Sequence, residues 1–162
     1  MAAQPNLDGM KFDLEVTIAR PAAEVFAYVA DVRNVPEWQH SAVAAEWLQP
    51  GSRFRERRSF VGRTADVELE VTACEPERRF DVRSVTGPVR FVIRHSFKPV
   101  GGGTLMCLEA EAKVGGVLRF AAAMAQHEAE RHLRADLARL KQILERRDEE
   151  SPSDRPPRPA GQ

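Results

Sequence analysis

The chain is poor in cysteine, and its two cysteines stand in no functional spacing. Cys74 and Cys107 are far apart and form neither a C-x-x-C pair nor a metal-type pattern. Small secreted domains held together by disulfides need more cysteines, so this class is excluded. We expect two reduced, half-buried thiols on predicted strands, as in a cytoplasmic protein.

An excess of one charge is also absent, since 24 basic residues balance 24 acidic ones and the formal net charge is zero. A protein held on nucleic acid by bulk charge carries a basic excess, so no nucleic-acid partner is expected. One local cluster is basic, but no exposed aromatics are interleaved with it, so we interpret it as a solvated strand face. It consists of Arg53, Arg55, Arg57 and Arg58.

Long apolar runs are missing as well. No stretch approaches the roughly 18 apolar residues of a membrane helix, which argues against stable membrane insertion. The segment MAAQPNLDG lacks the cationic start and apolar centre of a signal peptide. A cytoplasmic location is therefore expected.

What the chain does contain is enough apolar material for one core, at 43% hydrophobic residues over 162 positions. We expect a flexible N-terminus over residues 1–10 and one folded domain over residues 11–147. The Pro- and charge-rich remainder, residues 148–162, is predicted to be a disordered tail.

Turn residues at near-even intervals divide the middle of the chain into runs of alternating apolar and polar residues, which indicate antiparallel strands with one buried face. Pro21 is predicted to begin a first short helix, and Val35-Pro36-Glu37-Trp38 to form a second, very short helix or a turn. The predicted strands cover residues 11–18, 41–48, 52–61, 64–74, 79–85, 89–98 and 104–112.

A long helix is predicted over residues 117–146, because apolar residues recur there at a spacing of three and four. The first half of this apolar stripe is mostly alanine and the second half is leucine. Alanine cannot fill space, so a cavity is expected near the start of the helix, with close approach of helix and sheet as the alternative. The stripe consists of Leu118, Ala122, Ala125, Ala129, Leu133, Leu137, Leu140 and Leu144.

The order of these elements and several residues resemble a known superfamily. The stretch VTIARPAAEVFAYVADVRNVPEW carries Pro21, the Val25-Phe26 pair and Trp38 at matching places. Gly51 at the head of a strand, Gly102-Gly103-Thr104 before the last strand and ARLKQILE at the end of the long helix also fit. On these residues the chain resembles the START-like, polyketide cyclase/dehydrase and lipid-transport (SRPBCC) superfamily over about residues 12–146.

The resemblance implies an α+β helix-grip fold. In this fold a curved seven-stranded antiparallel sheet surrounds the long C-terminal helix, and two short helices lie between the first two strands. It also implies a hydrophobic pocket for a lipid, polyketide or aromatic molecule. Because the superfamily has no shared catalytic triad, the resemblance alone predicts no activity.

Three polar residues are predicted to share the buried face of the sheet. The parity of residues 89–98 places His95 with Phe91, Ile93 and Phe97, where it is either a general base or a neutral core histidine. Glu56 and Arg58 are predicted to share the inward side of the arginine-rich strand over residues 52–61, unless that strand is edge-like and both charges reach water.

Trp38 is interpreted as either a packing anchor or a residue that stacks on a ligand. His127 and His132 are five residues apart, which does not place both on one metal ion, so no metal site and no cofactor are expected. The candidate ligand-binding set is Trp38, Glu56, Arg58, Phe91, Ile93, His95, Phe97, Ala122, Ala125 and Ala129.

Three functions remain open at this point. The first is binding of a small hydrophobic molecule by a monomer or homodimer. The second is a polyketide cyclase or dehydratase that uses His95 as its acid–base. The third is a protein-interaction module with a filled core.

Overall fold

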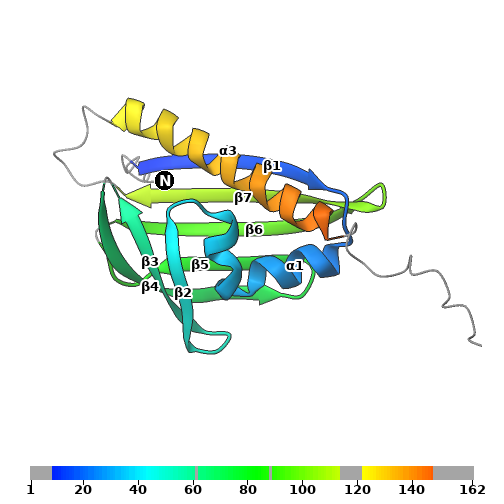
Figure 1. Ribbon diagram of the computed structural model, residues 1–162, viewed down its shortest axis with the longest axis horizontal. Helices are drawn as coiled ribbons and strands as arrows, with labels where there is room; N and C mark the ends of the chain where they lie inside the picture. The colour runs from blue at the N-terminus through cyan, green and yellow to red at the C-terminus, as the bar shows by residue number, and fades with distance from the viewer. Residues whose placement is uncertain (1–8, 61, 88, 114–121, 148–162) are drawn as a thin grey trace, which may run out of the picture.

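The computed structural model describes residues 9–60, 62–87, 89–113 and 122–147. It contains one sheet of seven antiparallel strands in the order β1-β7-β6-β5-β4-β3-β2, with the long helix α3 lying along β1 (Figure 1). The strands are β1 (Gly9–Ile18), β2 (Ala42–Gln49), β3 (Arg53–Phe60), β4 (Arg63–Glu75), β5 (Arg79–Ser84), β6 (Arg90–Val100) and β7 (Gly103–Lys113). The helices are α1 (Ala22–Ala30), the 3-10 helix η1 (Val32–Asn34), α2 (Val35–Trp38) and α3 (Ala122–Arg146).

The predicted fold class is confirmed: a curved antiparallel sheet, a C-terminal helix and short helices between β1 and β2. The second short helix is preceded by a 3-10 turn because Asp31 accepts a hydrogen bond from the Arg33 amide at 3.2 Å. One boundary differs from the prediction. β1 begins at Gly9, and Met10 pairs with Ala112 and packs against the core, so the flexible N-terminus predicted over residues 1–10 does not include Gly9 and Met10.

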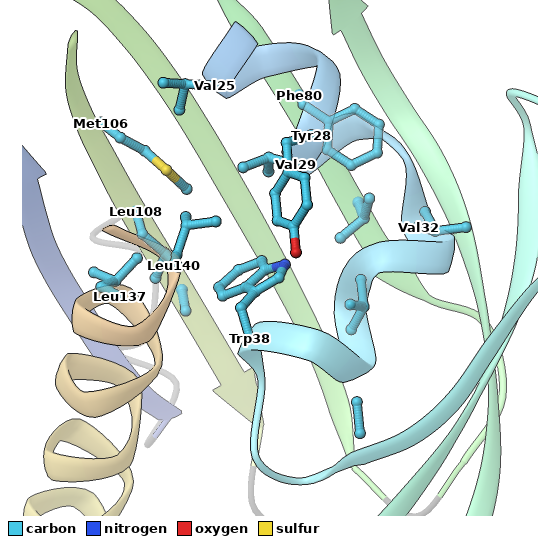
Figure 2. Close-up of a cluster of buried hydrophobic side chains, with 14 of the residues drawn as sticks. Val25, Tyr28, Val29, Val32, Trp38, Phe80, Met106, Leu108, Leu137 and Leu140 are labelled. Atoms are coloured by element: carbon cyan, nitrogen blue, oxygen red, sulfur yellow. The ribbon is translucent and has the colours of Figure 1, made fainter. Parts of the chain in front are cut away.

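The sheet bends over its concave face, where the core lies. Irregular register between Ala42 and Ala44, and again between Val71 and Ala73, marks bulges that increase the twist of the strands. The short helices close over this face, and Tyr28, Trp38 and Leu140 meet in the cluster seen in Figure 2.

The leucine half of the α3 stripe packs as predicted. Leu137, Leu140 and Leu144 are buried, and each burial contributes about 1.5–3 kcal/mol. Polar contacts fix the same end of the helix to the end of β1, since Lys141 Nζ donates to the Thr17 carbonyl at 2.6 Å. In the part of the chain that the structure describes, no helix combines the length and apolarity needed to cross a membrane.

Both cysteines are unpaired. Cys74 is exposed and Cys107 is half-buried, so the expectation of two half-buried thiols holds only for Cys107. Cys74 lies near the end of β4, opposite Phe80 on β5.

Candidate functional site

Strand β3 brings two charged side chains to the concave side of the sheet. Phe54, Glu56 and Arg58 share this side, and Glu56 is only 2% exposed. β3 lies between β2 and β4, so it is not an edge strand. The alternative was an edge-like strand from which both charges reach water. It is wrong for Glu56, which is buried, whereas the half-buried Arg58 keeps partial access to water.

Arg58 pairs with Glu56 along the strand, with Nε donating to Glu56 Oε2 at 2.6 Å. The same guanidinium donates to Ser41 Oγ at 2.8 Å and to Gln39 Oε1 at 2.6 Å. A buried ion pair is retained only when its remaining hydrogen-bonding groups are satisfied, and the residues before β2 supply these partners.

His95 faces the same interior from β6. Its Nδ1 lies 2.8 Å from the Phe80 carbonyl oxygen, and its ring stacks on Phe80 with centroids 6.0 Å apart. Because a carbonyl oxygen only accepts, Nδ1 carries the proton and Nε2 is an acceptor. Burial lowers the pKa of His95 below its ordinary value of 6.5, which keeps the ring neutral.

The acceptor Nε2 of His95 is buried and has no hydrogen-bond partner among the described residues. A buried polar atom without a partner is uncommon in a folded protein and calls for an explanation, such as a bound water or ligand. Trp38 Nε1 and Asp81 Oδ1 are likewise buried without a partner among the described residues.

A small cavity of about 20 Å³ adjoins these groups beneath the short helices, with room for about one water molecule. It brings together five of the predicted residues: Trp38, Glu56, Arg58, Ile93 and His95. Its other lining residues were not predicted: Val29, Val32, Val35, Gln39, Phe54, Leu69, Phe80 and Val82. The inward parity of β5 could have identified Phe80 and Val82, whereas no sequence signal marks Gln39.

The remaining predicted residues lie elsewhere. Phe97 is buried and packs edge-on against Phe26 at 5.6 Å between ring centroids. Phe91 is half-buried against the core. Ala125 is exposed and Ala129 is half-buried, while the side chain of Ala122 lies outside the described residues, as does Leu118. The cavity predicted under the alanine half of the helix therefore stays a prediction.

Trp38 is a buried anchor, 2% exposed, and its indole nitrogen is directed toward the Tyr28 hydroxyl in Figure 2. Tyr28 donates to Glu37 Oε2 at 2.5 Å. Burial is the main cause that raises the pKa of Tyr28 well above its usual range, and the Glu37 carboxylate is the second.

A larger hollow, of about 180 Å³, opens between β1 and α3. Its two basic residues already have partners: Arg134 pairs with Glu130, and Lys141 pairs with Glu145. Its lining is Leu14, Glu15, Val16, Arg134, Leu137, Ala138 and Lys141. Within the described ranges no three His, Cys, Asp or Glu side chains are grouped to hold a metal ion.

Comparison with known proteins gives a consistent family assignment. A family model described as polyketide cyclase / dehydrase and lipid transport matches residues 10–145. No curated protein matches the chain.

Several solved structures share the fold. A protein from Deinococcus radiodurans is 26% identical, with a TM-score of 0.66 over 83% of this chain and 97% of that one. A Thermus thermophilus protein is 18% identical, with a TM-score of 0.75 over 87% and 99%. The Zhui aromatase/cyclase from a Streptomyces species is 21% identical, with a TM-score of 0.72 over 86% and 96%. The last two similarities show the fold alone.

Proposed function

Because the chain belongs to the polyketide cyclase/dehydrase and lipid transport family, we propose that it binds a small hydrophobic molecule between its sheet and its helices. The ligand lies on the concave face, with its polar end at His95, Glu56 and Arg58. Two unpaired cysteines, one of them exposed, fit a reducing compartment, so we place this binding in the cytoplasm.

One observation carries the proposal: a largely apolar interior in which the buried acceptor His95 Nε2 has no partner in the part of the chain that the structure describes. Ligand sites in proteins are mostly apolar and hold a few placed polar groups, which is the arrangement around His95 Nε2. The neutral imidazole favours a ligand that presents a hydroxyl or phenol as donor. Arg58 lies in the same lining and is suited to a carbonyl or carboxylate oxygen.

The cavity is much smaller than such a ligand. Pockets for small molecules measure about 300–1,000 Å³, against about 20 Å³ here. Binding therefore requires the short helices or α3 to move away from the sheet. Phe91 and Ile93, which are only half-buried on the concave face, would gain contacts when a ligand occupies the enlarged space.

Native mass spectrometry of protein expressed in cells tests the proposal, together with thermal shifts for a panel of lipids, sterols and aromatic polyketides. Ile93→Trp fills the cavity and should remove the ligand-induced shift. Val92→Trp is the matched control, because Val92 neighbours Ile93 and points to the opposite face of β6. Absence of any co-purifying molecule and of any thermal shift would contradict the proposal.

A second candidate is an enzyme of the cyclase or dehydratase type, favoured by the state of His95. A neutral imidazole whose Nε2 is unpaired within the described ranges can accept a proton from a bound molecule as a general base. His95→Gln should then retain binding and lose turnover, with ligand composition followed by mass spectrometry. Binding without turnover in the native protein would leave only the carrier function.

A further inference from the structure

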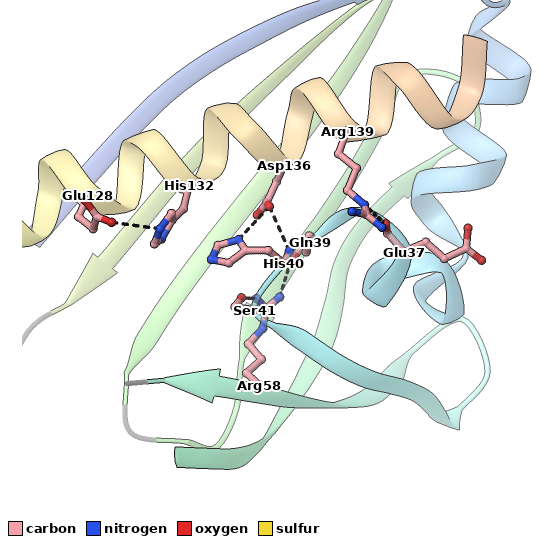
Figure 3. A network of polar contacts seen from close by, with 9 residues as sticks. All are labelled: Glu37, Gln39, His40, Ser41, Arg58, Glu128, His132, Asp136 and Arg139. Carbon is pink, nitrogen blue, oxygen red and sulfur yellow. Dashed lines mark hydrogen bonds and ion pairs between the residues drawn. The ribbon is translucent and has the colours of Figure 1, made fainter. Parts of the chain in front are cut away.

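The three residues between α2 and β2 connect the interior cavity to α3, and we call residues 39–41 the strap. Gln39 and Ser41 accept hydrogen bonds from Arg58, on the cavity side. His40, between them, lies against α3 instead (Figure 3). The strap therefore separates the Arg58–Glu56 pair from the long helix.

Asp136 of α3 holds the strap through a single oxygen. Its Oδ1 accepts from the His40 amide at 3.1 Å and lies 2.9 Å from His40 Nδ1. The His40 ring also contacts His132, with ring centroids 4.3 Å apart and the two planes tilted by 58°, and His132 Nε2 lies 3.1 Å from Glu128 Oε1. Asp136 is buried at 6% exposure, whereas the His40 side chain is 50% exposed.

The described contacts of the strap with α3 are polar, whereas the contact of α3 with β1 adds buried leucines to the polar bond between Lys141 and Thr17. Just before the strap, Arg139 Nε donates to the carbonyl of Glu37 in α2 at 2.5 Å. The His40 side chain is half-exposed, so its bond to Asp136 can be exchanged for a bond to water when the strap moves away from α3. Separating α3 from β1 would instead expose Leu137 and Leu140, which are buried. The strap is thus easier to separate from α3 than β1 is.

We propose that the strap is the gate through which a ligand reaches the cavity, and that His40 and Asp136 form its latch. This inference rests on the proposed function, since a gate needs a ligand. Opening the strap also removes Gln39 and Ser41 from Arg58. The freed guanidinium N–H groups can then bond to a ligand oxygen, so access and recognition are coupled.

The association rate of the apolar fluorescent probe anilinonaphthalene sulfonate, followed by stopped flow, tests the gate. Asp136→Ala removes both acceptor contacts, so the association rate should rise about tenfold if two hydrogen bonds of ordinary net strength close the strap. His40→Ala, at an exposed site, should act in the same direction without endangering the fold. Asp136→Asn keeps one acceptor oxygen and should fall between the native protein and Asp136→Ala.

Glu130→Gln is the matched control. It removes the pair with Arg134 on the same helix, away from the strap, and should leave the rate unchanged. Hydrogen exchange over residues 36–45 should be faster in Asp136→Ala and His40→Ala, which shows directly that the strap opens. Ile93→Trp should abolish the probe signal, because the probe then finds no cavity.

The outcomes separate the two proposals. Equal association rates and equal exchange in all variants would overturn the gate while leaving the ligand cavity intact. Probe binding that survives Ile93→Trp, or no binding by any variant, would overturn the cavity and the gate with it.

Discussion

Replacing Arg58 with methionine would leave Glu56 buried without its charged partner. Arg58 makes three side-chain hydrogen bonds, to Glu56, Ser41 and Gln39, and all of them are lost. Methionine retains much of the apolar volume of the arginine stem, so the change reports mainly on charge and hydrogen bonding.

The expected cost follows from the burial of Glu56, whose side chain is 3% exposed beside an arginine that is 12% exposed. Removing one partner of a buried ion pair costs about 3–5 kcal/mol. The lower end, about 3 kcal/mol, applies here because Arg58 is partly exposed and water can follow into its place. A domain with a stability of about 5–15 kcal/mol remains folded after that loss.

Urea unfolding followed by tryptophan fluorescence measures this cost, since Trp38 is buried in the same lining. The midpoint should fall by about 1.5 M at a slope of about 2 kcal/mol per M. Adding Glu56→Gln to Arg58→Met should restore most of the loss, because the stranded charge is then removed.

Arg57→Met is the matched control for this measurement. Arg57 is adjacent on β3 but exposed, and it pairs with Asp66 at the surface, so its midpoint should not change measurably. The reasoning is refuted if Arg58→Met costs no more than Arg57→Met, or if Glu56→Gln gives no rescue.

Three further predictions use other parts of the structure. Tyr28 is the only tyrosine, so absorbance titration should show no ionisation near its ordinary pKa of 10.0 in the folded protein. Glu37→Gln removes the carboxylate that helps to raise the pKa of Tyr28 and should therefore lower it, whereas titration near 10 in the native fold would contradict the burial of this side chain. The lowered pKa of His95 means that the unfolded chain takes up the proton first, so stability should fall as pH drops through about 6.5. His95→Gln should weaken this pH dependence of the free energy of unfolding, measured by urea unfolding at several pH values. An unchanged pH dependence would count against a lowered pKa of His95 in the folded protein. Gly103→Ala would place a Cβ 2.6 Å from the Ile18 carbonyl oxygen, a backbone atom that cannot move aside cheaply, so unfolding should become easier by about 1–3 kcal/mol. A melting temperature equal to that of the native protein would show that β1 can shift.

Much of the fold follows from local patterns in the chain. Alternation with a period of two identified the strands, and a stripe at helical spacing identified α3, because these periods depend only on residues close in sequence. The same parity argument placed Glu56, Arg58 and His95 on the concave face, where the structure finds them in one cavity lining. Parity worked because β3 and β6 are flanked by strands on both sides.

The alanine half of α3 shows the limit of such patterns. A helical stripe states which residues share a face, but it does not state what covers that face. The structure leaves Ala125 exposed and places the small described cavity under the short helices.

By itself, the sequence determined the strands, the long helix, their order and the inward face of β3 and β6, because repeating local geometry decides these. The helix-grip arrangement followed from the resemblance to the superfamily. Only the tertiary structure decided which groups meet. Arg58 finds partners 17 and 19 residues away, and His40 finds Asp136 across 96 residues. The tautomer of His95, with Nε2 as the acceptor, depends in the same way on the Phe80 carbonyl of a neighbouring strand. Such distances are set by the curvature of the sheet and the packing of α3, and no local pattern in the chain encodes them.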